Sequence, residues 1–169
     1  MNEQTHIIAV IVEHKPGVLF NVSNLFRCRG FNIESISVGQ TDQIDLARMT
    51  ITVKGDERTI EQVIKHLNKL IDVIKVSRLE PSNVVIRELA LVKIHTSNAK
   101  SRSEIMNYAN IFRARVVDVS QDSIMMEVTG DSEKIGAFIN LIKPFGVKEI
   151  SRTGITALSR GTKSVKLGD

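Results

Sequence analysis

Apolar positions along the chain fall into two copies of one pattern. Val53-Lys54-Gly55-Asp56 recurs as Val128-Thr129-Gly130-Asp131. After each Gly-Asp pair, apolar residues repeat at i, i+3, i+4 and i+7, the spacing of one helix face. They are Ile60, Val63, Ile64 and Leu67 in the first copy and Ile135, Phe138, Ile139 and Ile142 in the second. Each aspartate stands where it can cap the helix that follows.

A second match precedes these helices. Phe26-Arg27-Cys28-Arg29 recurs as Phe112-Arg113-Ala114-Arg115, at a slightly larger offset. The difference is explained by the loop between the two middle strands, which runs over 40–45 in the first copy. In the second copy a tight hairpin at Gln121-Asp122 replaces it. The sequence therefore predicts one fold used twice, with a longer loop in the first copy.

Each copy is predicted to run strand, helix, strand, strand, helix, strand. The first has strands over 7–12, 31–38, 46–53 and 73–79, and Pro16 is placed to start its first helix. The second has a strand over 85–95, helices over 102–112 and 132–142, and strands at 116, 124 and 147. This order predicts an α+β fold with two ferredoxin-like βαββαβ domains in tandem. We expect domains over 1–80 and 84–155, divided near Pro81-Ser82-Asn83, and a basic C-terminal tail over 156–169.

A ferredoxin-like sheet carries helices on only one face. The first strand nevertheless has Ile8, Val10 and Val12 on one side and Ile7, Ala9 and Ile11 on the other. Burying each aliphatic side chain is worth roughly 1.5–3 kcal/mol, so an apolar face does not stay in water. The pattern predicts a homodimer or packing against another subunit. The alternative is that the two copies within one chain cover each other.

Composition narrows the class of protein. Apolar residues make up 42 % of the chain and charged residues 25 %, with a single cysteine, Cys28. There is no apolar run near the roughly 20 residues that span a membrane, and Met1-Asn2-Glu3-Gln4 does not resemble a secretory signal. We therefore expect a cytoplasmic protein. Part of the net charge of +4 lies in the last ten residues, and strands 46–53 and 124–128 contain no aromatic residue for stacking on RNA bases. We expect no nucleic-acid partner.

No residue pattern in the sequence indicates catalysis. His6, His14, His66 and His95 fall on different predicted elements, without the paired spacing of metal ligands. The chain has no Gly-rich phosphate loop and no Gly-x-Ser-x-Gly elbow. We expect no catalytic residue, no metal site and no cofactor bound by this chain.

A small-molecule site is suggested where the first strand meets the first helix. The amides at a helix N-terminus attract carboxylates, and Gly17 lets a ligand approach the backbone closely. Asn32 could accept a hydrogen bond from an ammonium group, and Leu19 and Ile33 could form apolar walls. This combination fits valine, leucine or isoleucine. The alternative is that glycine and asparagine are ordinary turn and cap residues.

Specific segments resemble one known family. They are Pro16-Gly17-Val18-Leu19, Arg29-Gly30-Phe31-Asn32-Ile33-Glu34-Ser35, Ala47-Arg48-Met49-Thr50-Ile51, Glu88-Leu89-Ala90-Leu91-Val92-Lys93, Ile111-Phe112-Arg113, Val117-Asp118-Val119 and Arg152-Thr153-Gly154-Ile155. Together they resemble the small subunit of acetolactate (acetohydroxyacid) synthase, whose N-terminal domain is an ACT domain. The likeness covers nearly the whole chain.

The resemblance implies a regulatory subunit of acetolactate synthase. It would activate a catalytic large subunit that carries thiamine diphosphate, Mg and FAD, and would confer feedback inhibition by valine or another branched-chain amino acid. It also implies a homodimer through the ACT domain, with the effector held between the two copies. The matching effector-binding positions are His14, Gly17, Val18, Leu19, Asn32 and Ile33. The family commonly has asparagine where this chain has His14.

Two other functions remain open. One is a free-standing ACT-type amino-acid sensor that acts on a different partner, such as a transcription regulator. The other is a ferredoxin-like module that binds metal or nucleic acid. Tight metal uptake or salt-dependent DNA binding would distinguish the last of these.

Overall fold

The computed structural model describes residues 4–162 and 165, which divide into two compact units. Unit 1 comprises residues 1–85 and 155–169, and unit 2 comprises residues 86–154. The chain therefore leaves the first unit, builds the second, and returns. The chain passes from unit 1 to unit 2 after residue 85, and the segment after residue 154 belongs to unit 1.

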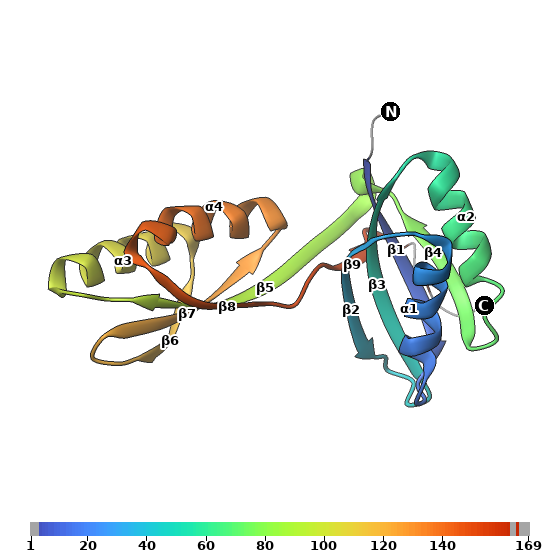
Figure 1. The fold of residues 1–169 in the computed structure, drawn as a ribbon, viewed down its shortest axis with the longest axis horizontal. Helices are drawn as coiled ribbons and strands as arrows, with labels where there is room; N and C mark the ends of the chain where they lie inside the picture. The colour runs from blue at the N-terminus through green and yellow to red at the C-terminus, as the bar shows by residue number, and fades with distance from the viewer. Residues whose placement is uncertain (1–3, 163–164, 166–169) are drawn as a thin grey trace. The chain divides into compact units, whose positions relative to one another are not determined.

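Unit 1 contains the βαββαβ order predicted for the first copy (Figure 1). Its elements are β1 (Gln4–Glu13), α1 (Val18–Arg29), β2 (Ile33–Gln40), β3 (Leu46–Gly55), α2 (Glu57–Leu67) and β4 (Val73–Leu79), followed by a short 3₁₀ helix (Pro81–Asn83) and, from the end of the chain, β9 (Thr156–Ser159). The four main strands form an antiparallel sheet in the order β2-β3-β1-β4. Strands β1 and β2 both run antiparallel to β3, so they point in the same direction.

The core of unit 1 lies between the sheet and its two helices. Residues from alternate positions of β1 and β3 face α1 and α2 because side chains alternate across a strand. The buried cluster consists of Ile8, Val10, Val12, Ala47, Met49, Ile51 and Val53 from the strands and Val18, Val22, Phe26, Ile60, Val63 and Leu67 from the helices. As predicted, Asp56 caps α2, accepting a hydrogen bond from Thr59 N at 2.8 Å.

The opposite face of the sheet is not left bare. Ile7, Ala9 and Ile11 are only 5, 0 and 5 % exposed within the single chain. The returning segment lies across this face: Ser37 Oγ donates to Ile155 O at 2.8 Å, and Arg48 Nη2 donates to Ala157 O at 2.9 Å. The apolar residues of this face are therefore covered within unit 1 and do not by themselves require a second chain.

The same segment corrects the expected tail. Residues 156–159, placed in the basic tail over 156–169, form β9, in which Ala157 is buried. β9 pairs with β5 (Val84–His95), whose first two residues also belong to unit 1. Arg160 N extends the attachment by donating to Asn83 O at 3.0 Å. The tail's Lys163 and Lys166 lie outside the described residues.

Unit 2 repeats the topology of unit 1. It consists of β5, α3 (Ala99–Phe112), β6 (Arg115–Val119), β7 (Ser123–Gly130), α4 (Ser132–Ile142), a short 3₁₀ helix (Lys143–Phe145) and β8 (Val147–Arg152), with the sheet order β6-β7-β5-β8. Helix α3 starts at Ala99, earlier than predicted, because Asn98 caps it and accepts from Ser101 N at 2.9 Å. Asp131 caps α4 as predicted. Two tandem ferredoxin-like units are confirmed.

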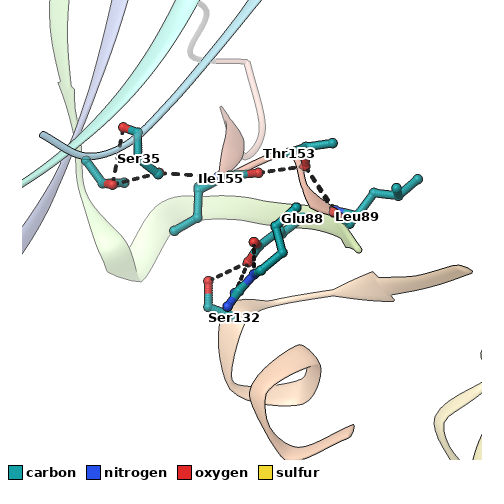
Figure 2. Close-up of polar contacts among 9 residues, drawn as sticks. Ser35, Glu88, Leu89, Ser132, Thr153 and Ile155 are labelled. Atoms are coloured by element: carbon teal, nitrogen blue, oxygen red, sulfur yellow. Dashed lines mark hydrogen bonds and ion pairs between the residues drawn. The ribbon is translucent and has the colours of Figure 1, made fainter. Parts of the chain in front are cut away.

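One charged group in unit 2 is buried at the start of β5. Glu88 is 4 % exposed and accepts hydrogen bonds from Arg152 Nε at 2.6 Å and Arg152 Nη2 at 2.7 Å. Ser132 Oγ, at the first turn of α4, donates to the same carboxylate at 3.1 Å (Figure 2). Hydrogen bonds from Arg152 lower the pKa of Glu88, against the opposing effect of burial. The pair ties β8 and α4 to β5 within this unit.

Candidate functional site

The turn between β1 and α1 has an unusual backbone conformation at Gly17. Gly17 is the N-cap residue of α1, with φ 89° and ψ −17°, a left-handed conformation that favours glycine. A Cβ at this position would meet no atom within 4 Å. The helix starts at Val18 rather than at Pro16, since Gly17 O accepts the first helical hydrogen bond from Asn21 N at 2.9 Å. Gly17 is therefore required by its conformation, and the space beside it is open.

Helix α1 differs from helices α2, α3 and α4 in its first turn. Asp56, Asn98 and Asp131 each place a side-chain oxygen on the amides of α2, α3 and α4, whereas α1 has no side-chain cap. Helix N-terminal amides without a side-chain partner bind water or a ligand, and the helix dipole favours an anion there. The first turn of α1 can therefore accept a carboxylate group.

Asp72 holds this turn in place, and the sequence did not single it out. The carboxylate accepts from Lys15 Nζ at 2.7 Å and from Asn21 Nδ2 at 2.9 Å, and Asp72 O accepts from Glu13 N at 2.9 Å. The hydrogen bond from Lys15, followed by that from Asn21, lowers the pKa of Asp72, and the same pairing raises the pKa of Lys15. Glu13 also pairs with Lys15. The ends of β1, α1 and β4 are thus joined at one carboxylate.

The predicted residues of this turn point in different directions. Val18 is buried in the core beneath α1, at the spacing of Val22 and Phe26, so only its backbone amide is available to a ligand. Leu19, one position on, is 46 % exposed. The His14 side chain is exposed, and His14 N donates to Asp45 O at 2.7 Å. A ligand at the turn would meet backbone amides, the Leu19 side chain and His14.

Asn32 and Ile33 lie at the other end of the sheet. Helix α1 separates Gly17 from Gly30, and its twelve residues span roughly 18 Å. Asn32 Nδ2 donates to Glu34 Oε1 at 3.1 Å, while Lys54 Nζ lies 3.1 Å from Glu34 Oε2. An open depression surrounds Asn32, lined by charged groups of α1, β2, β3 and the α2 cap. Within one chain, the six predicted residues therefore form two groups that one amino acid cannot bridge.

The described residues offer no metal centre. Among residues 4–162 and 165, no group of three or more His, Cys, Asp or Glu side chains is arranged to hold a metal ion. His6 is buried, with its Nε2 3.1 Å from Gly55 O, and Cys28 is exposed. Within the same residues, no helix has the length and apolar character needed to cross a membrane.

Comparison with known proteins matches both units to one family. Residues 8–75 match the model of the AHAS small subunit-like ACT domain, and residues 87–161 match that of the small subunit of acetolactate synthase. The chain belongs to the acetolactate synthase small-subunit family. The second match includes β9, in keeping with the ordered return of the chain to unit 1.

Relatives within this family resemble the chain over almost its full length. It is 58 % identical over 165 residues to a probable acetolactate synthase small subunit of Methanothermobacter thermautotrophicus, covering 98 % of each chain. It is 48 % identical over 161 residues to the acetolactate synthase small subunit of Mycolicibacterium smegmatis, covering 95 % and 94 %. The crystal structure of the small subunit from Thermotoga maritima matches with a TM-score of 0.89 at 43 % identity, covering 95 % of this chain and 99 % of that one. These matches establish the family and its two-domain fold, and a small subunit implies a catalytic large subunit as partner.

Proposed function

We propose that this chain is the non-catalytic regulatory subunit of acetolactate synthase, which activates the large subunit and makes it sensitive to valine, leucine or isoleucine. Membership of the small-subunit family supports the partnership. The uncapped first turn of α1 supports amino-acid binding, because it is placed to accept the effector carboxylate. Thiamine diphosphate, Mg and FAD belong to the large subunit in this proposal. The cytoplasm is the proposed location.

The division of the predicted site supports a homodimer. Strand β2 is an edge strand of its sheet, with β3 as its sole neighbour among the described strands, so its outer edge can pair with another strand. Gln40, at the end of β2, lies near the β1–α1 turn, whereas Ile33, at its start, lies at the far end. Antiparallel pairing of two β2 strands about a twofold axis brings Asn32 of one copy toward Gly17 of its partner. The effector then lies between copies, with its carboxylate on the α1 amides and its ammonium group near Asn32.

The direct test combines this chain with its cognate large subunit and measures acetolactate formation with and without valine. Gly17→Asp should preserve activation but raise the valine concentration for half-inhibition at least tenfold, because a carboxylate then occupies the ligand's position. Gly161→Asp is the matched control, since Gly161 also has positive φ (68°) and open space around it. Unchanged inhibition of the Gly17→Asp complex by valine would refute the site. Absence of activation by the wild-type chain would instead favour the free-standing sensor.

A mixing experiment tests whether the site is shared. Asn32→Ala should also weaken valine binding in calorimetry. If each site takes Gly17 from one copy and Asn32 from the other, a heterodimer of Gly17→Asp and Asn32→Ala chains contains one intact site. An equal mixture should then recover about a quarter of the wild-type valine sites after subunit exchange, as twofold symmetry requires. No recovery after demonstrated exchange would place the site within a single chain.

A further inference from the structure

Three large apolar side chains are strongly exposed at one end of unit 1. Phe20 in the first turn of α1 is 70 % exposed, Ile44 in the β2–β3 turn 78 %, and Ile71 in the α2–β4 turn 94 %. We call these three residues the apolar tip. Single exposed apolar residues are common, but a group of them at one end of a fold marks an interaction surface.

Backbone register places the three side chains at the same end of the sheet. Glu13 at the end of β1 pairs with Leu46 at the start of β3, and Val12 pairs with Val73 at the start of β4. The turns that carry Ile44 and Ile71 therefore open at the end where β1 leads into α1 (Figure 1).

Hydrogen bonds hold these turns to the β1–α1 turn and to the first turns of α1. Asp45, next to Ile44, accepts from His14 N at 2.7 Å. Asp72, next to Ile71, accepts from Asn21 Nδ2 at 2.9 Å, and Asn21 follows Phe20. Each residue of the apolar tip is thus followed in the chain by a residue that is hydrogen-bonded to another of these turns. The three turns are therefore held together, and the apolar tip is one defined surface.

A second copy of this chain does not cover the apolar tip in the proposed dimer. Antiparallel pairing of two β2 strands places the tips of the two copies at opposite ends of the combined sheet. Each tip then lies beside one composite effector site and stays open. In that dimer the occupant is a different protein. Asp42 and Asp45 are exposed in the turn of Ile44 and Lys69 is exposed in the turn of Ile71, so charge complementarity favours a partner with basic residues opposite the first turn and an acidic residue opposite the second.

We propose that the apolar tip is the surface by which this chain docks on the catalytic large subunit. This inference rests on the proposed regulatory function, because it assigns the surface through which activation passes. The arrangement also provides a short route for regulation. A carboxylate on the first-turn amides of α1 contacts the turn that carries Phe20, and Asp72 links that turn to Ile71.

The test compares the wild-type chain with the triple variant Phe20→Ser/Ile44→Ser/Ile71→Ser in the reconstituted enzyme. Large apolar anchors at an interface dominate its affinity, so the concentration of small subunit for half-maximal activation should rise at least ~30-fold. Ile111→Ser is the control, because Ile111 is 73 % exposed but lies on α3 of unit 2. It should shift half-maximal activation less than about twofold, the size of a peripheral contact.

Two further measurements separate the possible outcomes. Sedimentation of the triple variant should show an unchanged dimer, and valine inhibition at saturating variant should persist. Weaker self-association would show that the tip joins copies of this chain and would overturn the docking assignment. Unchanged activation by the triple variant, or an equal loss with Ile111→Ser, would overturn it while the regulatory function stands. If the wild-type chain neither binds nor activates the large subunit, both proposals fall.

Discussion

The buried ion pair of unit 2 allows a prediction whose size follows from its geometry. Glu88 receives two hydrogen bonds from Arg152 and one from Ser132, and its side chain is almost fully removed from water. Removing one partner of a buried pair costs about 3–5 kcal/mol. The Arg152 side chain is 41 % exposed and can regain water, which reduces the cost. Glu88→Gln should therefore lower the free energy of unfolding of unit 2 by about 2–3 kcal/mol at pH 7.

The loss of stability caused by Glu88→Gln should depend on pH and should be larger at neutral than at acidic pH. The folded-state pKa of Glu88 is lowered, so the ionised group stabilises unit 2 above its unfolded-state pKa. That stability is lost as the pH falls through the folded-state value. The difference between wild type and Glu88→Gln should thus be constant from about pH 8 to pH 6 and should begin to narrow below about pH 4, near the ordinary pKa of glutamate.

The chain contains a natural reporter for this measurement. It has one tyrosine and no tryptophan, and Tyr108 lies on α3, with its ring centroid 6.1 Å from that of Phe145. Tyrosine fluorescence during urea unfolding therefore follows unit 2. The double variant Glu88→Leu/Arg152→Met should lose less stability than Glu88→Leu alone, because no charge remains unpaired. A loss below about 0.5 kcal/mol for Glu88→Gln, within the range of ordinary surface changes, or a gap that does not narrow as the pH falls below about 4, would refute the reasoning.

Two other variants test unit 1. Arg48 is partly buried, its Nε has no hydrogen-bond partner among the described residues, and burial lowers its pKa. Arg48→Met removes this buried charge but also the hydrogen bond to Ala157 O, so the free energy of unfolding should change by less than about 1.5 kcal/mol in circular-dichroism urea curves. A loss above about 3 kcal/mol, the cost of breaking a buried pair, would instead indicate an essential contact of the guanidinium group. Asp72→Asn should weaken valine inhibition of the reconstituted enzyme, because Lys15 and Asn21 no longer meet a carboxylate beside the α1 turn. An unaltered valine response would show that Asp72 does not position the turn for effector binding.

The two halves of the site differ in how far the sequence could reveal them. Gly17 and the first turn of α1 could be found from the strand–Gly–helix pattern, because a helix start is a local feature of the chain. The sequence predicted that the helix starts at Pro16, but in the structure it starts at Val18. This later start places the Val18 side chain in the core. Asp72 gave no local signal, since its partners Lys15 and Asn21 are distant in the chain and meet it only in the folded unit.

By itself, the sequence determined the repeated βαββαβ order and the caps at Asp56 and Asp131, because periodicity and capping act between residues close in the chain. Only the tertiary structure showed that residues 155–159 return to the first sheet, through contacts such as Ser37 with Ile155. It also placed Gly17 and Asn32 at opposite ends of α1. Pairings between segments so far apart in the chain depend on how whole elements pack. In addition, a four-residue strand such as β9 is too short for its hydrophobic pattern to predict which strand it pairs with.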